Sequence, residues 1–365
     1  TESKTSSYFY DTNHQITATF DALSQLVVSN IYDVFGHVVQ QYTQGATNKL
    51  WKIFWSGWQT VEQDPAGGQR IFNYDNQGRL VSVKDQLGNL SQTFYDGQNH
   101  IIATVSPLNE TNQFIFDGNN NVIYSIDSLG YTNQFVFDGQ NNLIRTVDLR
   151  GNPTTIGYNT QFSVTGSTNG AGDWVNSAFN TDGTLHTRTD AGGTTTYGYD
   201  GYGIVNSVAY PNSLGSESFV NNSIGDPTSH TDGNNNVTSF YYNLRRDLTN
   251  TVAPTNITMK IVFDAVGNAA SATDPRGNSV SNSWSATRHL LKTMLPATAQ
   301  GTPVITNFYD SRDWLVKTVD PLLQSAFFTN DSAGRLVSAT DPLQRTSNFG
   351  FDAVGRKVAS TNAAQ

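Results

Sequence analysis

Histidine is the residue type best suited to acid–base or metal chemistry in this chain of 365 residues, and there are six copies. They are His14, His37, His100, His186, His230 and His289. No two stand at the His-x-x-x-His spacing of a metal site on a helix. Asp and Ser are plentiful, but no Gly-x-Ser-x-Gly motif holds a serine on a strained turn. We therefore expect no catalytic residues and no metal ligands, and we predict that the chain is not an enzyme.

Three runs rich in side-chain oxygen could bind a hard cation. They occupy residues 117–121, 138–142 and 232–236 and read Asp-Gly-Asn-Asn-Asn or Asp-Gly-Gln-Asn-Asn. Calcium takes about six to eight oxygen ligands, whereas each run offers one carboxylate. Gly and Asn are also the residues that best tolerate a positive φ angle. We expect turns that need no cofactor, with calcium as the open alternative.

Tryptophan is concentrated in one short segment: Trp51, Trp55 and Trp58 are half of the six in the chain. On a strand, Trp51, Ile53 and Trp55 share one face, while Phe54 and Trp58 point to the other. An exposed pair of indoles could stack on sugar rings of a glycan. The alternative, which we favour, is that these rings fill a wide place in the interior.

The elements that position these residues belong to an internal repeat. An aromatic residue followed by Asp or Asn recurs with a period close to 21 residues, as at Tyr74, Tyr95, Phe116 and Phe137. We call this aromatic residue the anchor and count 17 anchor positions, of which Asn221 and Asn330 are degenerate and Trp55 belongs to an irregular unit. The aromatic anchors of regular units are Tyr10, Tyr32, Tyr74, Tyr95, Phe116, Phe137, Tyr158, Phe179, Tyr199, Tyr242, Phe263, Trp284, Tyr309 and Phe351.

Each repeat contains two turn signals ten or eleven residues apart. The first is Asp-x-x-Gly directly after the anchor, with Asn in place of Gly at Asn99, Asn120 and Asn141. The second is Asp-Pro-x-Gly-Asn, complete at 274–278. Such turns leave room for strands of about five or six residues and none for helices. We predict an all-β fold: about 17 two-stranded units in one continuous antiparallel β-spiral, the wall of a shell, barrel or tube.

The strand that enters the first turn carries rings two residues apart, as at Phe114 and Phe116 or Phe135 and Phe137. Residues spaced by two lie on one face of a strand. Stacked units should therefore form a ladder of buried rings on one face, with Thr, Ser, Asn and Gln on the other. A single hairpin is marginally stable, so the array must supply the missing neighbours.

Composition excludes several classes of function. Only 14% of residues are charged, the net charge is −9, and Lys and Arg are not clustered, so we expect neither a nucleic-acid binder nor an anionic-membrane binder. No apolar window is long enough for a membrane span. Cysteine is absent, which excludes disulfides and thiolate sites and fits an exported bacterial protein. The sequence begins with Thr1, so we expect a processed chain or a segment of a longer one.

The motif Tyr-Asp-x-x-Gly-Arg-Leu followed by Asp-x-Leu-Gly-Asn, at residues 74–89, and its partial copy at 330–343 resemble the YD repeat. That repeat occurs in bacterial rearrangement-hotspot (Rhs) proteins, in components of insecticidal toxin complexes, in wall-associated proteins and in teneurins. The resemblance covers roughly residues 8–365. It implies a sheet that spirals into a hollow shell, which encloses an effector in the toxins and serves adhesion in teneurins.

The chain departs from the toxin pattern, because the Asp-Pro-x-Gly-Leu segment implicated in self-cleavage is incomplete, and we expect no effector within residues 1–365. We expect one repeat array over residues 1–365, with an irregular Trp-rich unit at about 48–70 and an insertion at about 296–303. We predict a secreted or surface-bound bacterial structural protein whose partners are further repeats or other copies of itself, and in addition an enclosed effector or surface glycans. The alternative is an adhesion protein that binds glycans.

Overall fold

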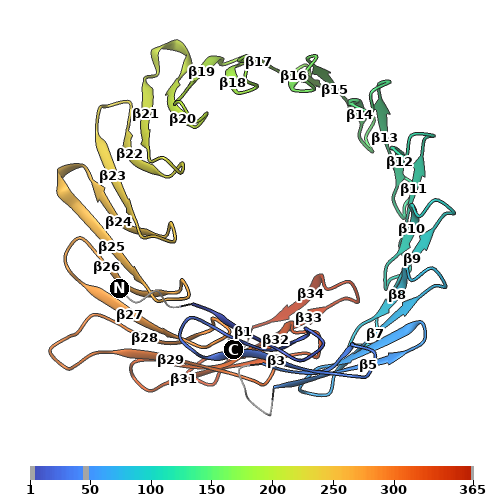
Figure 1. Ribbon diagram of the computed structural model, residues 1–365, viewed down its shortest axis with the longest axis vertical. Helices are drawn as coiled ribbons and strands as arrows, with labels where there is room; N and C mark the ends of the chain where they lie inside the picture. The colour runs from blue at the N-terminus through green and yellow to red at the C-terminus, as the bar shows by residue number, and fades with distance from the viewer. Residues whose placement is uncertain (1–4, 44–48, 363–365) are drawn as a thin grey trace. The chain divides into compact units, whose positions relative to one another are not determined.

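The computed structural model describes residues 5–43 and 49–362. These residues form 34 strands of one antiparallel sheet and two single 3₁₀ turns, η1 (Pro211–Ser213) and η2 (Pro254–Asn256). The described part contains no helix of the length and apolar character that crossing a membrane requires. The two strands per unit and the antiparallel pairing confirm the predicted fold class (Figure 1).

The strands are β1 (Ser7–Tyr10), β2 (Ile16–Phe20), β3 (Leu26–Tyr32), β4 (Val38–Thr43), β5 (Leu50–Ser56), β6 (Gln59–Gln63), β7 (Gln69–Tyr74), β8 (Leu80–Lys84), β9 (Leu90–Tyr95), β10 (Ile101–Val105), β11 (Thr111–Phe116), β12 (Val122–Ile126), β13 (Thr132–Phe137), β14 (Leu143–Val147), β15 (Pro153–Tyr158), β16 (Val164–Asn169), β17 (Trp174–Phe179), β18 (Leu185–Asp190), β19 (Gly193–Tyr199), β20 (Val205–Ala209), β21 (Ser216–Asn221), β22 (Pro227–Thr231), β23 (Val237–Tyr242), β24 (Leu248–Ala253), β25 (Ile257–Phe263), β26 (Ala269–Thr273), β27 (Ser279–Trp284), β28 (Leu290–Met294), β29 (Val304–Tyr309), β30 (Leu315–Val319), β31 (Ser325–Asn330), β32 (Leu336–Thr340), β33 (Thr346–Phe351) and β34 (Lys357–Thr361).

The chain divides into two compact units. Unit 1 comprises Thr1–Phe94, Val105–Asn109 and Ile261–Gln365, and unit 2 comprises Tyr95–Thr104 and Glu110–Lys260. Unit 1 therefore combines early and late repeats, whereas nearly all of unit 2 is one uninterrupted run of repeats.

Each repeat is a bulged hairpin followed by a connection to the next hairpin. In the hairpin of β11 and β12, Ile115 lies opposite Tyr124, but the anchor Phe116 lies opposite Val122. The register therefore shifts by one residue beside the anchor. The same shift recurs beside Phe137 and Tyr158. A bulge increases the local twist of a sheet, and here it is repeated with the period of the sequence.

The turns that directly follow the anchors lie at one edge of the sheet, the first edge, and the second turns of the repeats lie at the other, the second edge. The turns at the two edges have the same structure, although their sequence signals differ. The first-edge turn after Phe116 begins with Asp117, whose backbone N–H donates to Asn121 O (2.9 Å), while Asn120 N–H donates back to Asp117 O (3.2 Å). The second-edge turn at Asp127 has the same pair of bonds, with Tyr131 and Gly130 as partners. The fourth turn residue has positive φ in both, 68° at Asn120 and 84° at Gly130, as the Gly and Asn pattern predicts.

Two segments break the pattern. Between β5 and β6 the five-residue turn is replaced by a two-residue connection, Gly57-Trp58, and the register runs without a shift. Between β28 and β29 a longer loop forms an isolated bridge from Thr298 to Gly301. These segments lie at the predicted irregular unit, 48–70, and the predicted insertion, 296–303.

Burial differs from the expectation of one buried face. No apolar side chain in the described residues is buried, and rings such as Phe114 and Phe116 are half-buried. The opposite face is not purely polar either, because Phe94, Ile115 and Tyr241, each directly before an anchor, are 45–53% exposed. Both corrections have one cause: a single sheet layer has no second layer to cover its rings.

Candidate functional site

The turn carboxylates use their oxygens inside their own turns. Asp117 Oδ1 accepts hydrogen bonds from the N–H groups of Asn119 and Asn121 (2.8 and 2.9 Å), and Oδ2 accepts from Asn121 Nδ2 (3.0 Å). Asp138 and Asp232 do the same with Asn142 and Asn236. The Asn121 side-chain donor holds the pKa of Asp117 below its usual range. The runs considered for calcium therefore direct their carboxylates at N–H donors.

The anchors have a polar function that the sequence did not reveal. Tyr309 Oη donates to Leu290 O (3.0 Å), and Leu290 is the sixth residue after the preceding anchor, Trp284. Tyr199 Oη and Trp284 Nε1 make the equivalent bonds, to Leu185 O (2.7 Å) and Ala269 O (3.0 Å). The anchors that donate in this way are Tyr32, Trp55, Tyr158, Tyr199, Tyr242, Trp284 and Tyr309. Burial raises the pKa of Tyr309, which keeps the hydroxyl a donor.

The degenerate anchors keep this hydrogen bond. Asn221 Nδ2 donates to Val205 O (3.0 Å) and Asn330 Nδ2 to Leu315 O (3.5 Å), and both acceptors lie six residues after the preceding anchor. The two units therefore lose the ring and retain the contact between units. The signal in the sequence was the replacement of Tyr by Asn, another residue with a side-chain donor.

The tryptophans do not converge on one site. Trp51 is half-buried on β5, whereas Trp55 and Trp58 are 47% and 59% exposed. Trp55 Nε1 donates to Val38 O (3.0 Å), and its ring stacks on His37 at a centroid distance of 4.9 Å. Trp58 lies in the two-residue connection between β5 and β6.

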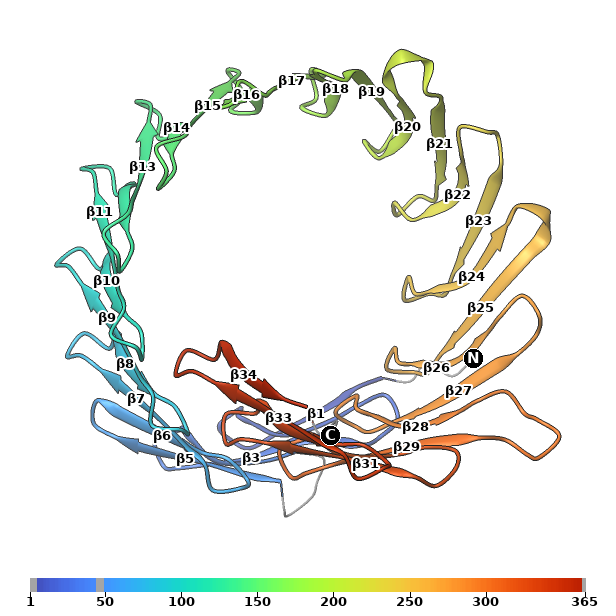
Figure 2. The same ribbon diagram turned by 180° about the vertical axis from the view of Figure 1, so that it is seen from behind.

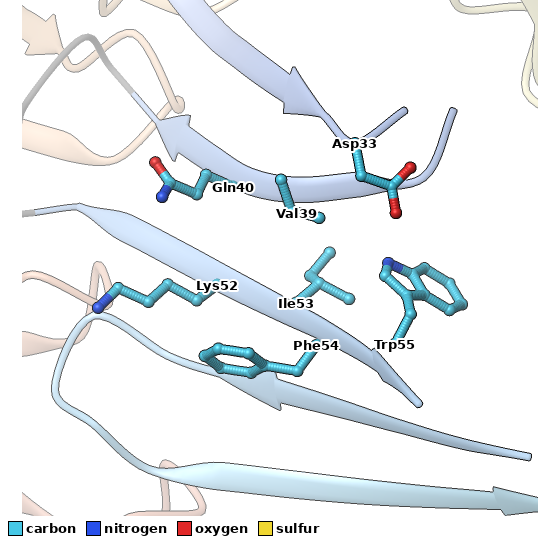
Figure 3. A pocket seen from close by; sticks show the side chains of 7 residues that line it. All are labelled: Asp33, Val39, Gln40, Lys52, Ile53, Phe54 and Trp55. Carbon is cyan, nitrogen blue, oxygen red and sulfur yellow. The ribbon is translucent and has the colours of Figure 1, made fainter. Parts of the chain in front are cut away.

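A shallow depression of about 290 Å³ lies beside Trp55. Figure 3 shows the Trp55 indole and the Asp33 carboxylate at one end and Lys52 and Gln40 at the other. An aromatic wall with a carboxylate, an amide and an amine suits a small polyhydroxylated ligand. Of the three tryptophans predicted to bind a glycan, Trp55 lines this depression, whereas Trp51 and Trp58 do not.

Within unit 1, early and late repeats meet edge to edge. Ser332 Oγ, on a first-edge turn, donates to Gln86 O, on a second-edge turn, at 3.3 Å. Lys49, directly before β5, forms an ion pair with Asp313, on the first-edge turn after Tyr309. A cavity of about 460 Å³ between Asp85 and Val354 also has walls from both sets of turns. We call this contact the seam. Figures 1 and 2 show the early and late strands of unit 1 lying side by side.

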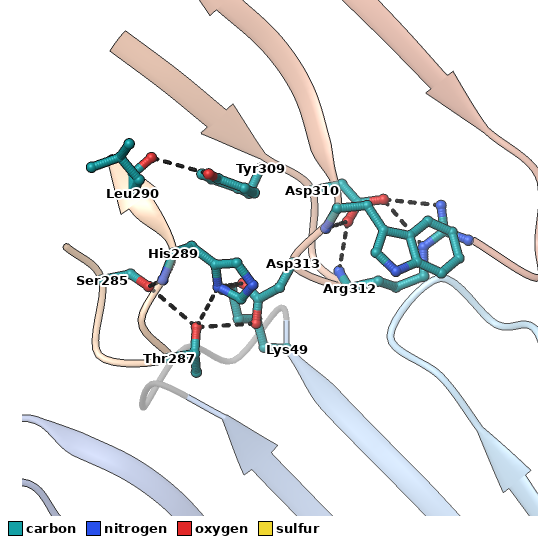
Figure 4. A network of polar contacts seen from close by, with 10 residues as sticks. Lys49, Ser285, Thr287, His289, Leu290, Tyr309, Asp310, Arg312 and Asp313 are labelled. Atoms are coloured by element: carbon teal, nitrogen blue, oxygen red, sulfur yellow. Dashed lines mark hydrogen bonds and ion pairs between the residues drawn. The ribbon is translucent and has the colours of Figure 1, made fainter. Parts of the chain in front are cut away.

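The polar groups around Asp313 include a hydroxyl, an imidazole and a carboxylate, the groups of a catalytic triad, but their geometry excludes a triad. Thr287 Oγ1 lies 2.8 Å from His289 Nδ1, and Asp313 Oδ1 lies 3.9 Å from the same nitrogen (Figure 4). In a triad the hydroxyl and the carboxylate bind different ring nitrogens, so that the imidazole can accept the hydroxyl proton. This group joins two neighbouring turns and holds Asp313 toward Lys49. No metal-type cluster of His, Asp and Glu occurs among residues 5–43 and 49–362.

Comparison with known proteins supports the fold. No protein-family model matches the sequence, and no curated protein matches it. The crystal structure of TcdB2-TccC3 matches 98% of this chain with a TM-score of 0.83 at 13% identity. The Photorhabdus luminescens Tc holotoxin pore matches 97% with a TM-score of 0.80, also at 13% identity.

The chain spans only 24% of the matched TcdB2-TccC3 chain and 23% of the matched holotoxin chain. At 13% identity the likeness shows the fold alone. It supports a YD-repeat-like architecture, as the anchor motif predicts.

Proposed function

We propose that this chain is a non-catalytic structural protein, whose repeat sheet forms part of the wall of a secreted or cell-surface assembly. The observation that carries the proposal is the absence of a buried apolar core in the described residues, together with an accessible surface of 22199 Å². A compact monomer of 39.9 kDa would expose roughly 14,000 Å². An accessible surface larger than that of a compact monomer is expected of a sheet that forms a single layer.

The hydrogen bonding supports the same function. Turn carboxylates bind their own turns, and anchor donors bind the preceding unit, so the polar groups of the repeat serve its construction. The seam adds edge-to-edge packing between repeats far apart in the chain. A wall needs both kinds of contact, one along the sheet and one between its edges.

Small-angle scattering tests the proposal. A compact chain of 365 residues has a radius of gyration of about 21 Å. We expect the folded monomer to exceed this value clearly while its circular dichroism remains that of a β protein. A radius near 21 Å would show that the sheet is folded into a compact body and would overturn the proposal.

We propose that the wall's partners are further repeats or other copies of the chain, and that it encloses or supports another polypeptide. The TcdB2-TccC3 complexes that share the fold support this reading. Limited proteolysis of the native assembly tests it. Any enclosed polypeptide should be cleaved only after the wall is opened by denaturant, and cleavage at the same rate in the intact assembly would count against enclosure.

The second candidate function is glycan binding beside Trp55, and the depression with its mixed polar and aromatic lining favours it. Glycan-array binding of the wild-type chain and Trp55→Ala would test it, with Trp174→Ala as the control, because Trp174 is also partly exposed, at 39%. Binding that is lost only in Trp55→Ala supports the site. Binding that survives in Trp55→Ala excludes it.

A further inference from the structure

Unit 1 has two sheet edges that the seam leaves uncovered. The seam joins second-edge turns of early repeats, such as the one containing Gln86, to first-edge turns of late repeats, such as the one containing Ser332. The first edge of the early repeats and the second edge of the late repeats take no part in the seam and stay uncovered. Because they are the edges that the seam does not use, they can make the same kind of contact with another molecule.

The first uncovered edge carries exposed apolar side chains. Val34 and Phe35, in the turn after Tyr32, are 93% and 82% exposed, and Trp58, on the neighbouring connection, is 59% exposed. Some other turns at this edge are polar, with Gly118 and Asn119 at the positions of Val34 and Phe35, whereas others expose a single apolar residue, such as Leu244. Exposed apolar side chains gathered on one edge mark an interaction surface.

The second uncovered edge is apolar as well. Leu322 and Leu323 are 77% and 84% exposed, and Leu343, on the next turn of that edge, is 69% exposed. The leucines at the same position in turns next to the seam, Leu87 beside Gln86 and Leu108 beside Pro107, are each only 39% exposed. The same turn position therefore loses much of its exposed surface where it meets a first-edge turn.

We propose that a second copy of this chain covers these edges, with the Val34, Phe35 and Trp58 edge of one copy packing against the Leu322, Leu323 and Leu343 edge of the next. In this contact, first-edge turns of one copy meet second-edge turns of another, just as first-edge and second-edge turns of one molecule meet at the seam. The carboxylates of these turns already accept hydrogen bonds within their own turns. His37 Nδ1 lies 3.1 Å from Asp33 Oδ2, and Arg345 Nε donates to Asp341 Oδ2 at 2.7 Å.

The two edges differ from each other, so the contact is heterologous and leaves one free edge at each end of a pair. Such a contact continues from copy to copy. The inference rests on the proposed function and specifies its partner: copies add head to tail and extend the wall.

Analytical ultracentrifugation of the full chain, with two edge variants, tests the inference. The wild type should show a weight-average mass above 39.9 kDa that rises with concentration. Phe35→Glu and Leu322→Glu should each weaken association at least tenfold. The control Leu244→Glu alters a fully exposed first-edge residue of unit 2 and should leave association unchanged. All variants should retain the wild-type melting temperature, because the altered side chains are exposed.

Mixing the two edge variants tests the head-to-tail order. Each variant keeps one intact edge, so an equimolar mixture should form a dimer that neither forms alone. A wild type that stays monomeric, or a mixture that does not associate, would overturn the inference. The scattering measurement remains separate: a monomer with a radius of gyration well above about 21 Å would preserve the wall proposal even if the copies do not associate.

Discussion

Two sets of second-edge turns show how the same local structure acquires different surroundings. Leu87 and Leu108 stand at the third position of turns in or beside the seam, and Leu129 stands at the same position of a turn in unit 2. Their exposed fractions are 39%, 39% and 79%. The sequence of the repeat determines the backbone structure of the turn, whereas contact with a distant repeat determines how exposed the leucine at its third position is. Stability therefore has two sources, the neighbours along the sheet and the partner at its edge.

The largest expected effect concerns the anchor rings of unit 2, where only neighbours along the sheet contribute. Phe116 is half-buried and stacks on His100 at a centroid distance of 4.4 Å. Phe116→Ala should lower the free energy of unfolding by about 2 kcal/mol, less than the cost of a fully buried ring. Gln134→Ala, on the opposite face, should cost under about 0.5 kcal/mol. Urea denaturation measures both, and equal losses would mean that the ring ladder does not stabilise the sheet.

The next effect isolates the anchor hydrogen bond. Tyr309→Phe keeps the ring and removes the donor to Leu290 O, so it should cost about 1 kcal/mol. The reverse change, Phe137→Tyr, adds a hydroxyl where the anchor has none and serves as the control. Thermal denaturation compares the variants. If Tyr309→Phe matched the wild type, the contact between units would depend on the ring alone.

A smaller effect on stability is expected from truncating a turn leucine, and it should be larger beside the seam than in an uncovered turn. Leu108→Ala should cost roughly 0.5–1 kcal/mol more than Leu129→Ala, because the seam removes more of the Leu108 side chain from water. Chemical denaturation of the two variants measures the difference. Equal costs would indicate that the seam leucine gains no stability from its distant neighbour.

The smallest effect is the acid sensitivity of single turns. Hydrogen bonds from Asn121 and Asn142 hold the pKa values of Asp117 and Asp138 below their usual range. A lowered pKa in the folded state gives stability above the unfolded value, near 4, that is lost as the pH falls through the folded value. Asp117→Asn with Asp138→Asn should therefore reduce the loss of melting temperature below about pH 4. An identical acid profile would contradict the role of these carboxylates.

The sequence predicted the local structure well, because most repeats carry the same turn and anchor signals. Positive φ was predictable at Asn120 but not at Phe162 or Leu323, whose side chains disfavour it. In those turns the hydrogen bonds of the surrounding hairpin fix the backbone. Asn221 was interpreted as degenerate because its ring is missing, although it keeps the donor.

The seam could not be predicted from the repeat. Lys49 and Asp313 are 264 residues apart, and no feature of the period links them. Their contact depends on tertiary packing between distant hairpins, which the signals within one repeat do not encode. The exposure of the rings was mispredicted for a related reason: composition indicates a chain that can bury rings, but not whether a second layer is present.

Spin labels placed across the seam test the central claim, that early and late repeats of one chain pack edge to edge. The chain contains no cysteine, so Gln86→Cys with Ser332→Cys provides a unique labelled pair. The two single-cysteine variants control for contacts between molecules. We expect a single short distance between the labels in the folded monomer, and this distance should be lost on unfolding in urea. A long or broad distance distribution in the folded monomer would contradict it.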